Sequence, residues 1–269
     1  MKKPLLSVAI LCLSALSAFS QEIEWIEGPA TASIGDIAEI NVPEGYVFTG
    51  ADGTKRLMEA MQNPVSNTEL GFLAPASVFE GGEDSWYVVF EFDSIGYVKD
   101  DQKDDLDADA ILKSIRAANQ EANKMRVARG WPELHVVGWA VRPNYNPQTN
   151  NLEWATRVSA NDGEDSINYN TRLLGRKGVM AVTLVTGVDA FSGVKTSYEQ
   201  SLAGFSFVKG ERYAEWKSGD KIAQYGLTGL VVGGGAAIAA KTGLLAKFWK
   251  ILIIPFLAIG AFIKKIFKR

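Results

Sequence analysis

Hydrophobic and polar residues alternate along several stretches of the chain, and a period of two is typical of β-strands. The clearest stretch is Ser85–Asp93, in which Trp86, Val88, Phe90 and Phe92 share one face and a mixed set occupies the other. This pattern predicts a half-buried strand. Alternation or a short apolar run predicts further strands over residues 34–42, 134–142, 152–158, 167–174, 179–188 and 205–208.

Turn-forming residues separate some of these strands so closely that neighbours are expected to pair antiparallel. Residues 143–151 are rich in Pro and Asn, which predicts a hairpin between strands 134–142 and 152–158. Gly-Arg-Lys-Gly at 175–178 joins the next two strands. A phosphate-binding P-loop needs GxxxxGK[ST] leading into a helix, whereas an apolar strand follows here, so this segment is interpreted as a turn.

Apolar residues at helical spacing predict three helices. The first covers 52–62 with Asp52 as its N-cap, and the last lies within 189–202. The longest covers 107–129, and Gly130 ends it. Its apolar stripe is formed by Ile111, Ile115, Ala118, Ala122 and Met125.

An acidic run precedes this long helix, with six aspartates from Asp100 to Asp109. If Asp105 were the first ligand of an EF-hand, Ala110 would stand at the required glycine and Arg116 at the bidentate glutamate, so that pattern fails. Negative charge is favourable at a helix N-terminus. We therefore interpret the run as a helix cap, and no metal site is expected.

The order of strands, hairpins and helices predicts one α+β domain over residues 21–224, built as a mostly antiparallel β-sheet with packed helices. Residues 1–20 have a basic start, an apolar run and small residues before Gln21, which is typical of a cleaved secretory signal peptide. An uncleaved N-terminal anchor is the alternative.

The C-terminal part predicts a membrane anchor. Residues 225–246 are long enough for a transmembrane helix if Lys241 reaches a headgroup, and 247–269 form a basic amphipathic tail on the cytoplasmic side. The apolar run 251–263 is too short to return through the bilayer, although a two-span hairpin is the competing model. The expected location is therefore the bacterial cytoplasmic (inner) membrane, single-pass, with the main domain outside the cytoplasm.

Small residues recur every four positions in the predicted anchor, at Gly229, Gly233 and Ala237. Such a ridge lets two helices approach closely, so it predicts anchor packing in a possible homodimer. Glycine runs also occur in spans that pair with nothing, and this alternative stays open.

The net charge and the scarcity of cysteine and histidine limit the kinds of chemistry that the protein is expected to carry out. Cys12, in the predicted signal, is the only cysteine of the chain, so disulfides and thiolate catalysis are not expected in the mature protein. Residues 21–224 carry 19 basic and 31 acidic side chains, a net charge of −12, which argues against binding nucleic acid. His135 is the one histidine, so a catalytic dyad or metal site built on histidine is not expected.

Several blocks of sequence together resemble a bacterial family of membrane-anchored proteins known as domain of unknown function 2167. The blocks are VPEGY at 42–46, GYVKDD at 96–101, GWAVRPNY at 138–145, LEWA at 152–155, NYNTRLLGR at 168–176 and GDKIAQYG at 219–226. The resemblance implies a signal-bearing, membrane-anchored protein and implies no activity. The order of elements is also similar to the sheet-and-helix sandwich of PsbP-like proteins.

These observations favour a non-enzymatic binding or interaction module of the envelope, which contacts the lipid bilayer and an unknown protein or envelope ligand. No catalytic or cofactor-binding residue is assigned, because GxSxG and HExxH are both absent. One alternative is an envelope hydrolase that uses paired carboxylates. A second alternative assigns the function to the C-terminal tail. Tyr145, Asn170 and Arg176 are the candidate ligand surface, with structural roles in turns and sheet as the alternative.

Overall fold

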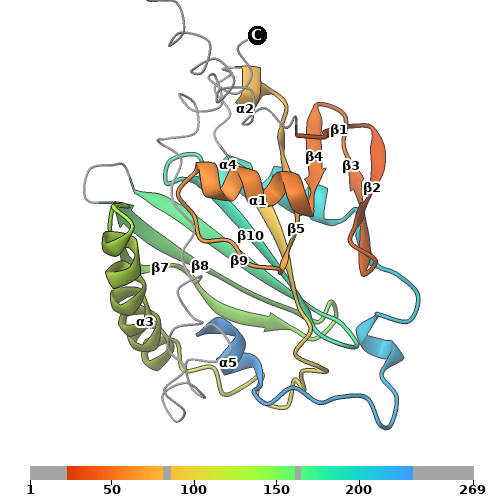
Figure 1. The fold of residues 1–269 in the computed structure, drawn as a ribbon. Helices are drawn as coiled ribbons and strands as arrows, with labels where there is room; N and C mark the ends of the chain where they lie inside the picture. The colour runs from red at the N-terminus through yellow and green to blue at the C-terminus, as the bar shows by residue number, and fades with distance from the viewer. Residues whose placement is uncertain (1–22, 81–85, 161–164, 233–269) are drawn as a thin grey trace, which may run out of the picture.

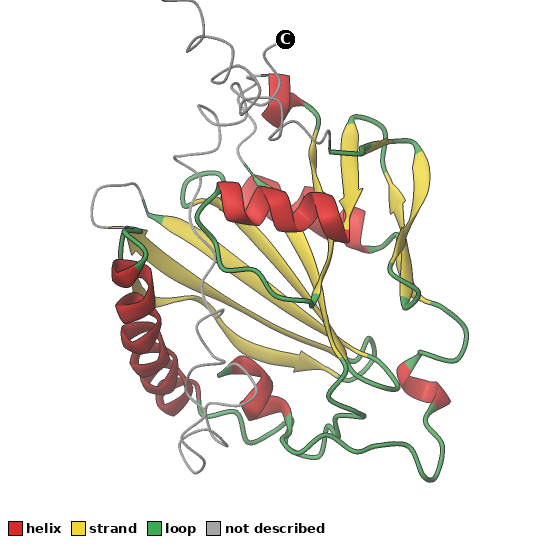
Figure 2. Cartoon of the chain, in the orientation of Figure 1, coloured by secondary structure: helices red, strands yellow, loops and turns green. Residues whose placement is uncertain are grey.

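The computed structural model describes residues 23–80, 86–160 and 165–232. They form one large antiparallel sheet, a small second sheet and helices on both sides (Figures 1 and 2). The large sheet has the strand order β1 (Ile26–Glu27), β4 (Tyr46–Gly50), β5 (Glu69–Pro75), β6 (Tyr87–Asp93), β10 (Val179–Gly187), β9 (Ser166–Leu174), β8 (Asn151–Ala160) and β7 (Leu134–Asn146). The small sheet has the order β11 (Phe205–Phe207), β3 (Ala38–Val42) and β2 (Ala30–Ile34). The helices are α1 (Ala51–Ala60), α2 (Ser77–Glu80), α3 (Ala108–Ala128), α4 (Phe191–Leu202) and α5 (Leu227–Val231), with a 3-10 turn at Tyr213–Glu215. The predicted α+β class with a mostly antiparallel sheet is confirmed.

Different elements pack against the two faces of the large sheet. On one face, Met180, Val182 and Leu184 of β10 pack with the small sheet and with Tyr198 of α4. The opposite face, which we call the helical face, carries α1, α3 and α5. Figure 1 shows α1 across the upper part of this face, α3 beside β7 and α5 at the lower end. The centre of the helical face carries buried polar side chains, among them Glu69, Asn170 and Thr183.

Strand β6 is buried on both faces, so the prediction of a half-buried strand is wrong. Val88 and Phe90 pack towards the small sheet, as alternation requires. Tyr87 and Val89 pack under α1 with Leu57. A helix from another part of the chain covers the face that was expected to meet solvent.

Helix α3 follows its local sequence closely. The Asp107 carboxylate accepts hydrogen bonds from the backbone amides of Asp109 (3.1 Å) and Ala110 (3.0 Å), so the predicted N-cap is confirmed. Gly130 ends the helix with a φ of +69°, a conformation that suits glycine. The cap expected at the start of α1 is wrong: Gly50, not Asp52, is its N-cap, because the helix begins directly where β4 ends.

The β7–β8 and β9–β10 hairpins are both confirmed. Strand β7 is longer than predicted and its register shifts three times against β8, so simple alternation fails along it. Burial alternates only at its start, where Leu134 and Val136 are buried and Val137 is exposed. Of the predicted strand over 34–42, only residues 38–42 form one strand, β3; Ile34 is the last residue of β2, and a turn at Gly35 (φ +57°) joins the two. Strands β4 and β5 were not predicted.

The segment 209–224 is polar, yet it is held against the domain. The Tyr213 hydroxyl donates a hydrogen bond of 2.9 Å to the carbonyl of Val98, and Ile222 pairs with Tyr97 in a β-bridge. The rings of Tyr97 and Tyr213 stack at 4.4 Å between centroids. The chain therefore reaches α5 along the lower end of the sheet (Figure 1).

Residues 225–232, which the sequence assigns to the start of the anchor, pack against the domain. Leu227, Leu230, Val231 and Val232 are buried in one cluster with Ile115 and other residues of the helical face. Within residues 23–80, 86–160 and 165–232, no helix has the length and hydropathy of a membrane span. The predicted signal peptide, the anchor from Gly233 onward and the basic tail lie outside the described residues.

Candidate functional site

Strand register brings a row of charged residues together on the helical face. Glu69 of β5 lies opposite Glu91 of β6, which lies opposite Ala181 of β10, and Ala181 lies opposite Arg172 of β9. Residues directly opposite each other on antiparallel strands point to the same face. We call Glu69, Glu91, Ala181 and Arg172 the charged row; it crosses four adjacent strands in the middle of the sheet.

Strand β9 is the reason that the centre of this face is polar. Its odd-numbered residues, including Ile167 and Tyr169, pack into the apolar core on the other face. Of its even-numbered residues, which point to the helical face, only Leu174 is apolar; the others are Ser166, Asn168, Asn170 and Arg172. An interior strand with helices on its face is normally apolar, so this polar set needs a reason beyond packing.

Arg172 is the most unusual member of the charged row. Its guanidinium lies over the Trp154 ring, with its carbon 4.8 Å from the ring centroid. Its Nη1 atom is buried without a hydrogen-bond partner, and no ion pair within the described residues involves this side chain. Burial lowers the pKa of Arg172, while the nearby carboxylates of Glu91 and Asp93 act in the opposite direction. The described part of the chain thus leaves a buried guanidinium only partly satisfied.

The acidic end of the row is tied to the loop before β5. The Glu69 carboxylate accepts hydrogen bonds from the Ser66 amide (2.7 Å) and from the Ser66 hydroxyl (2.9 Å). The Thr68 hydroxyl lies 2.8 Å from that of Ser66 and donates to the Glu91 carboxylate at 3.2 Å. Two carboxylates therefore stand side by side, bridged by two hydroxyl groups.

Ala181 separates the acidic and basic ends of the row. Adjacent strands lie about 4.8 Å apart, so the backbones of β6 and β9 are about 10 Å apart on either side of β10. Only a methyl group rises from the sheet between Glu91 and Arg172. In the next row, the Thr183 hydroxyl donates to the Asn170 amide oxygen at 3.4 Å. The arrangement offers charges of both signs and neutral donors around a small residue, which suits binding a polar ligand.

Two of the three predicted ligand residues lie on this face, but each has partners in the protein. Asn170 is buried in the row next to Arg172, and its amide group donates to the Asn168 carbonyl at 3.1 Å. Tyr145 is buried on β7, where its hydroxyl donates to Asp100 (3.2 Å) and accepts from Asn150 (3.1 Å). Both residues are therefore placed near or along the charged row, and neither is an exposed surface group.

Arg176 lies apart from them, in the turn between β9 and β10. Its Nε and Nη2 atoms donate to the two carboxylate oxygens of Asp220 at 2.7 and 2.8 Å, and Nη1 donates to the Gly210 carbonyl at 3.3 Å. The hydrogen bonds from Arg176 and from the Lys217 amide lower the pKa of Asp220 to about 2. This arginine fastens the segment 209–224 to the sheet.

Of the predicted anchor-packing residues, only Gly229 is described. It is buried in α5, where an added Cβ would lie 2.8 Å from the Cβ of Tyr225. Gly233 and Ala237 lie outside the described residues. The close approach made by Gly229 is thus within the domain.

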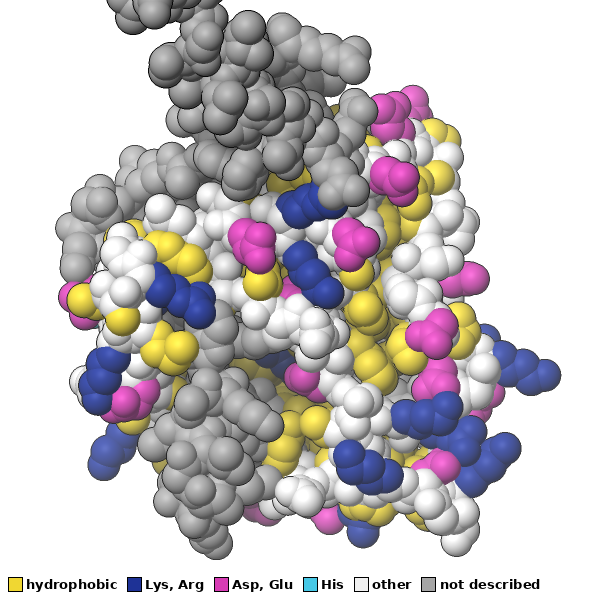
Figure 3. Space-filling model, in the orientation of Figure 1, with side chains coloured by type: hydrophobic (Ala, Val, Ile, Leu, Met, Phe, Trp, Pro, Cys, Tyr) yellow, Lys and Arg dark blue, Asp and Glu magenta, His cyan; other side chains and the backbone are white. Residues whose placement is uncertain are grey.

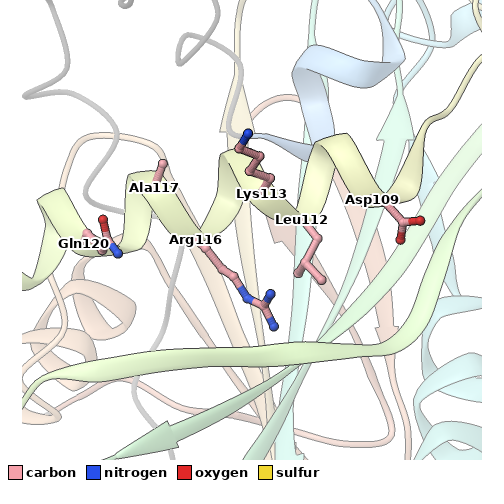
Figure 4. Close-up of a pocket in the computed structure, with 6 residues that line it drawn as sticks. All are labelled: Asp109, Leu112, Lys113, Arg116, Ala117 and Gln120. Carbon is pink, nitrogen blue, oxygen red and sulfur yellow. The ribbon is translucent and has the colours of Figure 1, made fainter.

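Two hollows lie elsewhere on the molecule. One, of about 440 Å³, runs along α3, where Leu112 and Arg116 point towards β7 and Lys113 points away (Figure 4). Arg116 donates to the carbonyls of Val136 and Val137. The other, of about 430 Å³, is lined by Trp25, Tyr46 and Phe79 beside β1 and β4. Within the described residues no group of three or more His, Cys, Asp or Glu side chains forms a metal site.

The family model for proteins of unknown function called DUF2167 matches residues 26–264, which is most of the chain. The chain belongs to the DUF2167 family. The resemblance inferred from the sequence blocks is therefore confirmed. No curated protein matches the DUF2167 chain.

Solved structures show only a distant likeness to this DUF2167 protein. The solution structure of cyanobacterial PsbP (CyanoP) from Synechocystis sp. PCC 6803 has a TM-score of 0.40 and 10% identity, covering 77% of this chain and 98% of that one. The Ran-binding protein Mog1p from Saccharomyces cerevisiae has a TM-score of 0.33 and 10% identity, covering 74% of this chain and 100% of that one. No statement about function follows from likeness at this level.

Sequence reasoning missed the charged members of the row in this DUF2167 protein. Arg172 stands within the block NYNTRLLGR that carries the family resemblance, and strict alternation along it puts Arg172 on the same face as Asn170. That signal was present in the sequence. Glu69 and Glu91 had no comparable signal, because their place beside Arg172 depends on the order of four strands.

Proposed function

We propose that this DUF2167 protein is a membrane-anchored, extracytoplasmic binding module of the bacterial envelope, and that the centre of the helical face is its binding surface. The observation that carries the proposal is the charged row, with the buried and incompletely bonded Arg172 on a central strand. A buried donor left without a partner costs about 1–3 kcal/mol. Apolar residues would stabilise the same place better, so a role in recognition explains the row.

The route of the chain supports the membrane-anchored part of the proposal. Helix α5 is packed in the domain, and the segment that follows it, from Gly233, is apolar and basic. Lys and Arg side chains gather at the lower right of the molecule, over the segment after β11 (Figure 3). Trp216 in that segment is 42% exposed. Exposed tryptophan with basic side chains is favourable at a membrane surface.

A thiol-labelling experiment tests location and binding in the same protein. The only cysteine is Cys12, so Cys12→Ser gives a background on which a single thiol can be placed. Glu39→Cys, on the exposed side of β3, should react in intact spheroplasts with a maleimide that cannot cross membranes. Reaction only after lysis would contradict the extracytoplasmic location.

Asp93→Cys places a thiol at an exposed position of β6, in the row of the helical face next to the charged row. It should be protected from a small maleimide in native membranes and react after purification, because the bound partner is lost. The Glu39→Cys protein serves as the control and should react equally in both states. Equal labelling of Asp93→Cys in the two states would show that the helical face is not a binding surface.

Hydrolysis by paired carboxylates is the second candidate, because Glu69 and Glu91 lie directly opposite each other. The contacts of Glu69 with Ser66 also hold the loop before β5, which is a structural role. Glu91→Gln keeps the shape of the side chain and removes its charge. If the protein turns over an envelope glycan, this variant should abolish turnover; a catalytic rate unchanged by Glu91→Gln would exclude the pair.

A further inference from the structure

The two arginines at the end of β9 have very different surroundings. Arg176 uses three nitrogen atoms, two on Asp220 and one on a backbone carbonyl. Arg172, four residues earlier, contacts the Trp154 ring, and a cation–π contact uses none of its five N–H donors. The first is an arginine with a purely structural set of partners, whereas the second keeps a donor for a group that the described residues do not supply.

We propose that Arg172 binds an oxyanion, a carboxylate or a phosphate group, of the ligand held on the helical face. This inference rests on the proposed function and names the chemistry of the same site. The guanidinium is planar and matches the two oxygens of a carboxylate or phosphate, so such a group can satisfy the buried Nη1 atom. Trp154 beneath the guanidinium fixes its position.

The neighbours of Arg172 supply further contacts. Ala181 is directly opposite it, so that only a methyl group stands on β10 between Arg172 and Glu91. The Thr183 hydroxyl and the Asn170 amide lie in the next row. These neutral groups can bond the remaining polar atoms of the ligand without adding charge.

Glu91 limits which anions fit. Its carboxylate is two strands away from Arg172, beyond Ala181, and Glu69 stands beside it. Like charges repel at this separation in a partly buried place. The ligand is therefore an oxyanion whose other end, over β6, is neutral or cationic, such as a zwitterion, and it is not a polyanion.

The test uses the full chain in detergent micelles and measures its melting temperature against the concentration of two probes, inorganic phosphate and acetate. Ionic strength is held constant with chloride, because salts affect stability in general. The wild type should be stabilised with a saturable dependence on at least one probe. Arg172→Met should need a concentration about tenfold higher or more for the same effect. Arg142→Met, which removes an exposed guanidinium from β7, is the matched control and should respond like the wild type.

Arg172→Lys covers the case in which Arg172→Met does not fold. It keeps the charge and loses the planar fork, so its response to the probe should also be weaker than that of the wild type. A response to phosphate alone assigns a phosphate group, a response to acetate alone assigns a carboxylate, and both support the proposal. No saturable response of the wild type, or equal responses of wild type and Arg172→Lys, would overturn it.

The two proposals can fail separately. If Asp93→Cys is protected in membranes but no probe stabilises the protein, the helical face binds a partner that is not an oxyanion. If a probe acts through Arg172 but Asp93→Cys is never protected, the oxyanion site stands and the proposed occupancy in the envelope is wrong.

Discussion

Ending the chain at Gln224 rather than at Val232 should strongly destabilise the domain. The eight residues removed include Leu227, Leu230, Val231 and Val232, whose side chains are 0, 6, 2 and 6% exposed. Full burial of one such side chain contributes about 1.5–3 kcal/mol, so four contribute about 6–12 kcal/mol at most. Domains are stable by about 5–15 kcal/mol in total. The shorter fragment should therefore be close to its unfolding threshold at room temperature.

Loss of α5 also uncovers the residues beneath it. Ile115 of α3, Leu174 of β9 and Val179 of β10 share the cluster with α5 and would meet water. The shorter fragment should then bind a dye specific for exposed apolar surface and lose its near-ultraviolet circular dichroism. Its secondary structure should be less affected, because the large sheet does not include α5.

The assay compares two secreted fragments, 21–224 and 21–232, by thermal unfolding. Within the longer fragment, Leu227→Ala should cost about 2–5 kcal/mol, because it removes a fully buried side chain. Thr228→Ala, at the partly exposed neighbouring position, is the control and should change stability by less than about 0.5 kcal/mol. Equal melting temperatures for the two fragments would refute the assignment of α5 to the domain.

Three further predictions concern single contacts. Because the Asp220 pKa is lowered to about 2, below the usual value of about 3.9, its ion pair with Arg176 should stabilise the fold above pH 4 and be lost as pH falls towards 2. Unfolding curves of Asp220→Asn should therefore change less across that range than those of the wild type, and parallel curves would contradict this role. Ile115→Ala should lower the free energy of unfolding, measured in urea, by about 2–5 kcal/mol, because this side chain is buried. Val127→Ala, on the exposed side of α3, should lower it by less than about 0.5 kcal/mol. Equal losses for the two variants would show that the buried face of α3 is misassigned. Asp107→Ala should cost about 1 kcal/mol in the same assay, since it removes the cap of α3, and no change would mean that the cap is unimportant.

Local signals explain why α3 and the two hairpins were predicted well. The Asp107 cap, the apolar stripe and Gly130 all act within a few residues of the helix they define. Strand β4 is five residues long and runs directly into α1, so its sequence shows no complete alternation. Strand β5 contains Gly71 and ends at Pro75, residues that normally indicate turns. The positions of β4 and β5 in the sheet are set by the strands with which they pair.

The candidate site shows the same division between local and long-range information. Asn170 was named as a candidate from the sequence, and the period of two places Arg172 on the same face of one strand. Glu91 stands in the same row as Arg172 only because β6 pairs with β10, which follows it after three intervening strands and a helix. No residue of the chain near Glu91 encodes that pairing. The charged row is therefore visible once the strand order is known and not before.

The start of the predicted anchor shows why hydropathy alone could not locate the end of the domain. A charge-free run is favourable both in lipid and in a protein core, so the run from Tyr225 to Ala240 fits either place. Its first half packs as α5 beneath the sheet, where Gly229 gives Tyr225 room to approach the helix. If the anchor begins after Val232, only 14 residues remain up to Ala246, fewer than the roughly 20 that a spanning helix needs.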